Sequence, residues 1–421
     1  MVSASARIPG VLAQRGREAG KLTGVRTAAL AAGIAAAVSL VSPLEAAEEL
    51  PFVKDGRAAF VLSDIRYALA EGDAEVTGVC PNGFSLQLQE IFAMGPEGKR
   101  RPGESDEEFG RRLQQGARTL GTAPDGRDFC QHPELAEPDP HFRTVEVSDV
   151  RVEGIPLGST SAVVANARTD QRFPSLEGEG QVENQFYRLV GCSRSFQSGG
   201  QSNGFVIEML TGSWGILVTL DDVDDIHNDD HVEVGLYANG DPIRLSPSRE
   251  PLPYATYAIK DDERFKATTR GRIENGVLIS EPVDVRFQHV VNSMLLERVI
   301  RAAIVHLNIN ADGTLEGYLA GYSPVEELYD YQFGFRNGKT FQGELAPLRL
   351  RSGSSNGAAF VLGHTCHGIY HAMYELADGH PDPDTGKYTS LSTQYKIKAI
   401  PAFVFDPATV SSSTAQSVEV E

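Results

Sequence analysis

Alternation of apolar and polar side chains between residues 180 and 350 is the feature that most restricts the fold. In the run 231–237, Val232, Val234 and Leu236 share one face. The same period of two recurs at 285–289, 305–309 and 331–335. Turn dipeptides punctuate these runs at Asn239-Gly240, Asn275-Gly276, Asp312-Gly313 and Asn337-Gly338. Period two is typical of half-buried strands, and such dipeptides favour the positive φ of hairpin turns. We therefore predict an antiparallel β-sandwich over residues 180–350.

The flanking regions are expected to complete a mainly β fold with a mixed α+β N-terminal region and a short C-terminal helix. Residues 205–210 and 214–220 are apolar on both faces, which predicts central strands. In the mixed region, 48–179, we expect strands at 58–62 and 84–92 and a helix at 105–120, where Ser105 and Glu108 form a capping box. The segment 351–406 should contribute a Ser/Gly link at 352–357, a strand at 358–362, a helix at 365–377 and a strand around 395–399, packed on the sandwich. The tail 407–421 should be frayed.

The first 47 residues resemble a cleaved signal peptide. Five basic residues precede an uncharged, Ala-rich stretch at 27–44, and the small pair Ala46 and Ala47 follows. Pro43 interrupts this stretch, so it matches poorly the roughly 20 strongly apolar residues that span a bilayer. We expect export to the periplasm, cell surface or medium, with no integral membrane span after processing. A retained N-terminal anchor is the alternative.

A strongly acidic balance restricts the partners. The formal net charge is −19, and the predicted leader carries more basic than acidic groups, so its removal makes the remainder more negative. Such a charge repels nucleic-acid phosphates, and we expect no nucleic-acid partner.

Four cysteines, an even number, are compatible with two disulfides in an oxidising compartment. Spacing does not fix the connectivity. Because Cys80 and Cys130 bracket one loop-rich segment, the preferred pairing is Cys80 with Cys130 and Cys192 with Cys366.

An acidic loop between two predicted strands is the first candidate metal site. Carboxylates crowded into one loop repel one another unless solvent or a hard cation screens them, and Ca²⁺ takes six to eight oxygen ligands. The predicted calcium ligands are Asp221, Asp222, Asp224, Asp229 and Asp230. A solvated connection without a metal is the alternative, because the spacing is not that of an EF-hand.

A histidine-bearing segment is the second candidate. On a helix at 365–377, His367 and His371 would share one face, and His364 or Glu375 could complete a Zn²⁺ or Cu²⁺ site. A solvated polar face is the alternative. The order Cys366-His367 also resembles the end of a haem-attachment motif whose first cysteine is missing, which gives haem as a weaker alternative.

Two further patterns concern ligands and catalysis. Glu316, Tyr318 and Tyr322 alternate along one predicted strand, and a tyrosine face beside a carboxylate can bind a glycan or a protein. Core packing explains the same pattern. Residues 353–357 match G-x-S-x-G, but too little chain follows for the remaining parts of a hydrolase.

Together these features predict an exported, noncatalytic binding or accessory protein, stabilised by Ca²⁺, with a glycan or protein ligand. A metalloprotein or redox partner that uses the His/Cys segment is the alternative, and a secreted hydrolase is a weaker one.

Overall fold

The computed structural model describes residues 52–68, 80–146, 155, 157, 184–197, 206–211 and 214–409. All of them belong to one compact unit, Glu49–Glu421. The predicted signal peptide, 1–47, and most of the predicted tail lie outside the described residues. No helix in the described part of the chain combines the length and the hydropathy needed to cross a lipid bilayer.

The fold is mainly β and mostly antiparallel, as predicted. The strands are β1 (Ala58–Tyr67), β2 (Ile216–Asp221), β3 (Asn228–Ala238), β4 (Ala255–Ala258), β5 (Lys266–Glu274), β6 (Val277–Ser280), β7 (Val283–Val291), β8 (Met294–Ile309), β9 (Leu315–Pro324), β10 (Gly379–Pro381) and β11 (Tyr388–Phe405). The α-helices are α2 (Leu88–Met94), α3 (Asp106–Leu120), α5 (Gln185–Val190), α6 (Arg194–Gln197), α8 (Val325–Leu328), α9 (Leu348–Leu362) and α10 (Cys366–Leu376). Short turns of helix are η1 (Pro96–Gly98), η2 (Pro133–Leu135), η3 (Glu263–Phe265) and η4 (Tyr329–Phe333).

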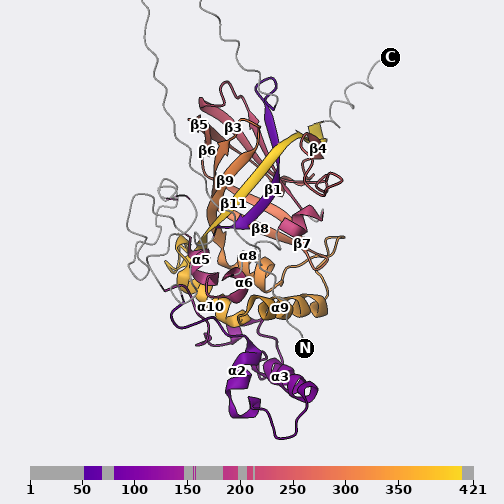
Figure 1. The fold of residues 1–421 in the computed structure, drawn as a ribbon. Coiled ribbons are helices and arrows are strands. Elements are labelled where there is room, and N and C mark those ends of the chain that lie inside the picture. The colour runs from indigo at the N-terminus through magenta and orange to yellow at the C-terminus, as the bar shows by residue number, and fades with distance from the viewer. Residues whose placement is uncertain are drawn as a thin grey trace, which may run out of the picture. The chain divides into compact units, whose positions relative to one another are not determined.

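Eight strands form a sheet that closes on itself (Figure 1). The order is β1-β2-β3-β5-β6-β8-β9-β11, and β11 pairs again with β1, every neighbour being antiparallel. Opposite walls of this one sheet therefore enclose the core, in place of two separate facing sheets. The predicted apolar faces point inward, since Val232, Val234 and Leu236 are buried in the main core. β1 and β11 come from the regions predicted to flank the sandwich, so all three regions share this core.

Turn chemistry explains the register at two points. Asn275 and Gly276 connect β5 to β6 with φ values of 52° and 78°, which are those of the predicted two-residue hairpin turn. Gly313, with φ 80°, turns the chain between β8 and β9.

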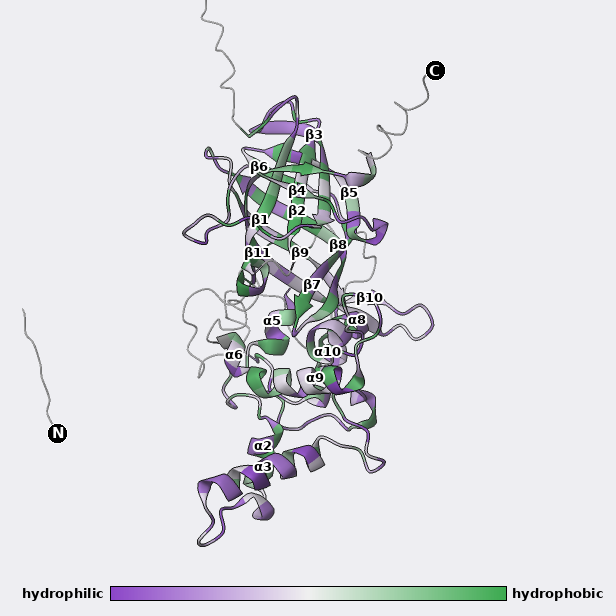
Figure 2. Ribbon diagram, turned by 90° about the vertical axis from the view of Figure 1, so that its right-hand side faces the viewer, coloured by the Kyte–Doolittle hydropathy of each residue, from purple (hydrophilic) through white to green (hydrophobic). Residues whose placement is uncertain are grey.

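The helices lie at one end of the closed sheet, and the α2–α3 pair lies beyond α9 (Figure 1). β7 and the first half of β8 form a hairpin that extends from the sheet toward these helices (Figure 2). The capping box of Ser105 and Glu108 starts α3 as predicted, and Thr365 caps the predicted C-terminal helix, α10.

Several local predictions are wrong. The Ser/Gly link and the strand at 358–362 are both part of α9, whose inner residues Ser355, Ala359 and Leu362 are buried. The predicted strand at 84–92 is a loop followed by α2, and residues 206–210 are helical. Residues 329–333 form η4, in place of the strand that the alternation over 331–335 predicts. Three alternating positions are too few to distinguish a strand from a buried helical turn. Residues 407–409 form a short helical turn, in which Asp406 accepts the N–H of Ala408 at 2.9 Å, and the rest of the predicted tail lies outside the described residues.

All four cysteines are in disulfides, but the preferred pairing is wrong. The bonds join Cys80 to Cys192 and Cys130 to Cys366, across sequence separations of 112 and 236 residues. The fold places Cys130 beside the first turn of α10 and Cys80 beside the end of α5, so proximity in sequence is not what decides the partners.

Removal of the Cys130–Cys366 disulfide, which closes the longer of the two loops, should destabilise the protein. We expect C130A/C366A to lose about 2–5 kcal/mol of unfolding free energy, since this bond restricts the unfolded chain over a long loop. Denaturant unfolding measures the loss, and peptide mapping without reductant identifies the pairs. Recovery of a Cys80–Cys130 peptide would contradict the structure.

β8 and β9 approach each other closely at Gly317, which leaves no space for a larger side chain there. A Cβ there would lie 2.0 Å from the carbonyl oxygen of His306, so Gly317→Ala should cost about 1–3 kcal/mol in urea unfolding. Gly110, in α3, has open space around it, and Gly110→Ala should stabilise the protein by up to about 1 kcal/mol. Equal effects at the two sites would show that the strand contact is wrong.

Candidate functional site

The acidic loop is organised by its own backbone. Asp229 accepts the N–H groups of Asp224 at 2.7 Å and His231 at 3.0 Å, and Asp221 pairs with Arg57 at 2.7 Å. Across the described residues, no group of three or more His, Cys, Asp or Glu side chains is placed to hold a metal. The calcium site at Asp221, Asp222, Asp224, Asp229 and Asp230 stays a prediction without support from this geometry.

The three histidines of the second candidate point to different neighbours. His364 lies between the rings of Phe142 and Phe333, at centroid distances of 6.1 and 5.8 Å. His371 is bonded through Nε2 to the carbonyl oxygen of Ala136 at 2.7 Å, and His367 contacts another aromatic ring. Burial lowers the pKa of His367 and the neighbouring His371 lowers it further, so these two lie close together, as their shared helix face predicts. Among the described residues no third His, Cys, Asp or Glu side chain completes a group with them, and a Zn²⁺ or Cu²⁺ site stays a prediction. Because Cys366 is in a disulfide, it has no thiol for a haem thioether.

The predicted ligand face is partly covered. Tyr322 is 1% exposed and packs with Ile155, Leu157 and neighbouring strand residues, which is the core-packing alternative. Glu316 pairs with Lys398 at 3.1 Å, and Tyr318 is half-buried. Binding at Glu316 and Tyr318 stays a prediction, whereas Tyr322 is not presented to a ligand.

The G-x-S-x-G match is not a nucleophile turn. It lies inside α9, and its Ser355 is fully buried. The Ser355 hydroxyl donates to the carbonyl of Ser352 at 3.1 Å and accepts from Gln131.

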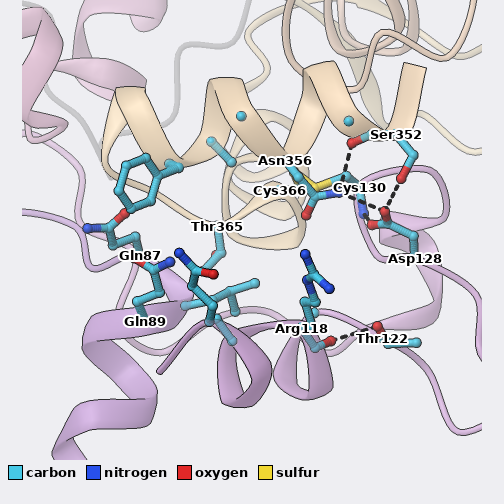
Figure 3. A pocket seen from close by; sticks show the side chains of 18 of the residues that line it. Gln87, Gln89, Arg118, Thr122, Asp128, Cys130, Ser352, Asn356, Thr365 and Cys366 are labelled. Carbon is cyan, nitrogen blue, oxygen red and sulfur yellow. Dashed lines mark hydrogen bonds between the residues drawn. A yellow bond between two sulfur atoms is a disulfide. The ribbon is translucent and has the colours of Figure 1, made fainter. Parts of the chain in front are cut away.

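A pocket lies between α3 and α9 (Figure 3). We call it the α3–α9 pocket, and its volume is about 900 Å³. One wall is α9 and the opposite wall is α3, while the start of α2 and the loop around Asp128 close its sides. The residues that carry its chemistry are Gln87, Gln89, Gln114, Arg118, Thr122, Asp128, Arg349, Ser352, Asn356, Phe360, His364 and Thr365.

Asp128 ties the N-terminal region to α9. Its carboxylate accepts the hydroxyl of Ser352 and the Nδ2 of Asn356, which lie one helical turn apart, and also the N–H of Cys130 at 2.7 Å (Figure 3). The adjacent Cys130–Cys366 disulfide adds a covalent link to α10. These contacts fix the loop that forms one side of the pocket.

Two arginines supply positive charge. Arg118, in the last turn of α3, extends toward α9 (Figure 3), and Arg349 lies in the first turn of α9. Neither forms a salt bridge with any residue in the described ranges, whereas Arg111, on the same helix as Arg118, pairs with Glu107. A cation in the first turn also opposes the helix dipole, so Arg349 is not placed there for helix stability.

His364 forms a buried, uncharged part of the wall. It is 2% exposed, its Nδ1 lies 3.2 Å from the carbonyl oxygen of Thr365, and its Nε2 has no hydrogen-bond partner within the described residues. Burial lowers the pKa of His364 to about 4, against the backbone hydrogen bond, which raises it.

Sequence reasoning missed this pocket. Its walls come from segments more than 200 residues apart, and the sequence of α9 predicts a Ser/Gly link and a strand in place of a helix. The i, i+4 spacing of Ser352 and Asn356 was the local signal, but only the tertiary contact with Asp128 gives it meaning.

The pKa of His364 should make stability depend on pH. In the unfolded chain this imidazole titrates near 6.5, so between pH 6.5 and about 4 the unfolded state binds a proton that the folded state does not. The free energy of unfolding should therefore fall as the pH drops through this window, by up to about 3 kcal/mol from this group. His364→Gln should flatten that slope, and His132→Gln, at a more exposed histidine, is the control. An NMR titration of His364 near pH 6.5 would contradict this.

Comparisons of the chain with protein-family models, with curated protein sequences and with solved structures found no match. The geometry and charge of the α3–α9 pocket are therefore the basis for assigning a function.

Proposed function

We propose that the chain is an exported, noncatalytic binding protein that takes an acidic oligosaccharide in the α3–α9 pocket. The observation that carries this proposal is the presence of Arg118 and Arg349 in one pocket without a salt-bridge partner among the described residues. The formal net charge of the whole chain is −19, and against this background two arginines in one pocket favour a ligand with carboxylate or sulfate groups there. A guanidinium binds such planar or tetrahedral anions through two parallel hydrogen bonds.

The remaining lining suits a ligand rich in hydroxyl groups. Gln87 and Gln114 present amides, which donate and accept hydrogen bonds, as sugar hydroxyls do, whereas the NH₂ group of Asn356 already donates to Asp128 and Ser352. Phe360 is 52% exposed and lines the same pocket, so its ring is available to stack on the apolar face of a sugar. The volume of about 900 Å³ lies within the usual range for small-ligand sites.

The carboxylate content of the α3–α9 pocket favours binding of the sugar over its hydrolysis. Glycosidases generally use a pair of Asp or Glu residues across the scissile bond. Among the described residues that line this pocket, Asp128 is the only carboxylate; its Oδ2 accepts from Ser352 and Asn356, and its Oδ1 accepts the N–H of Cys130.

Export is the second part of the proposal. Two disulfides in a chain of this size are more common in oxidising compartments, and the basic, then apolar, pattern of residues 1–47 supports the same location.

A calorimetric titration with two matched oligosaccharides tests the ligand. We expect the purified protein to bind tetragalacturonate, which is acidic, and to bind neutral maltotetraose at least about tenfold more weakly. R118Q/R349Q should weaken tetragalacturonate binding about 10- to 100-fold, the range for loss of hydrogen bonds to charged groups. Because the attraction is electrostatic, added salt should weaken binding to the original protein more than to the variant.

Arg111→Gln is the matched control, since it removes one charge from the same helix outside the pocket. It should leave the affinity unchanged. If neither sugar binds, or if R118Q/R349Q binds tetragalacturonate as tightly as the original protein does, the proposed ligand class is wrong.

A further inference from the structure

A second pocket lies on the other side of α9. Its volume is about 440 Å³, and we call it the hairpin pocket because the end of the β7–β8 hairpin forms one wall. The other walls are η4, α9 and the short helix at 206–210. Gly353 and Gly357 line both this pocket and the α3–α9 pocket, so α9 separates the two.

The lining of the hairpin pocket is mainly apolar. Val291, Phe335 and Leu362 contribute aliphatic and aromatic surface, and Ala358 lies on the α9 wall. Such a surface favours an apolar molecule over water, provided that the few polar groups in it find partners.

His289 is the polar group that needs a partner. It is 3% exposed, it lines the pocket, and its Nδ1 has no hydrogen-bond partner among the described residues. The ring of Trp214 stands edge-on to it at a centroid distance of 6.0 Å, which fixes its orientation without a polar contact. A buried imidazole in this position is usually hydrogen-bonded.

Glu208 is another of the polar residues in the lining, which also include Asn292, Tyr331, Gln332 and Ser354. Burial raises its pKa to about 7, although the charge of Arg298 lowers it. Burial also lowers the pKa of His289 well below its ordinary value, and Arg298 acts in the same direction. Arg298 itself does not line the pocket; it donates to Gln332, which does, and to the hydroxyls of Tyr67 and Tyr395. The same desolvation that suppresses charge on these groups disfavours a charged ligand.

We infer that the hairpin pocket is a ligand site of its own, which takes a small, uncharged, mainly apolar molecule with one hydrogen-bond donor that reaches His289. Glu208 provides a second polar contact at the same site. This inference does not depend on the proposed oligosaccharide site, because the two pockets share the backbone of α9 but none of the groups that would bind each ligand.

Two fluorescent probes with one skeleton test the inference. N-phenyl-1-naphthylamine is uncharged and has one N–H donor, whereas 1-anilinonaphthalene-8-sulfonate adds a negative charge. We expect the full chain to bind the uncharged probe at one saturable site and the sulfonate at least about tenfold more weakly. Tighter binding of the sulfonate would overturn the inference, since Arg298 would then be attracting an anionic ligand.

Two variants test whether the uncharged probe binds in the hairpin pocket. Ala358→Phe fills the hairpin pocket and should abolish binding of the uncharged probe. His289→Phe keeps an aromatic ring but removes the acceptor, and should weaken binding about 2- to 10-fold, the range for one neutral hydrogen bond. Circular dichroism checks that each variant is folded. If Ala358→Phe does not fold, His289→Phe still tests the inference.

Asn356→Ala is the matched control, because Asn356 lies on the same helix and lines only the α3–α9 pocket. It and R118Q/R349Q should retain full binding of the uncharged probe, which separates this inference from the proposed function. A folded Ala358→Phe or His289→Phe protein that binds the probe unchanged would overturn the inference.

Discussion

The antiparallel pairing of β1 with β11 is the contact on which the rest of the structure depends. It joins residues near the start of the described chain to residues near its end, with Ile65 opposite Ile397 and Tyr67 opposite Tyr395. Without it the sheet would have two free edges, and the core residues that line its interior would lie open along one seam. β11 also pairs with β9, β10 and β4, so this one strand connects four others.

The candidate site is built differently from this scaffold. Its walls are helices whose positions depend on few but strong contacts, above all those of Asp128 with α9 and the Cys130–Cys366 bond. A rigid sheet with helices gathered at one end leaves surfaces between the helices that the core does not need to fill. Binding groups can occupy such surfaces at little cost to stability.

Much of the scaffold was predictable because its signals are local. Val232, Val234 and Leu236 alternate as a strand requires, Asn275-Gly276 marks its turn, and the capping box at Ser105 starts α3. The site was not predictable, because α9 has a helix-poor composition and is helical through burial and packing. The disulfide partners depend in the same way on which segments the fold brings together, and the spacing of the cysteines in the sequence does not reveal this.

The closure of the sheet by its first and last strands has a consequence for the order of events during synthesis. Asp64 pairs in the sheet with Lys398, which lies 334 residues later in the chain, so the sheet cannot close before β11 has been synthesised. Contacts so distant in sequence form slowly. Such late closure would suit a chain that is exported as we propose, because a translocating chain has to stay unfolded.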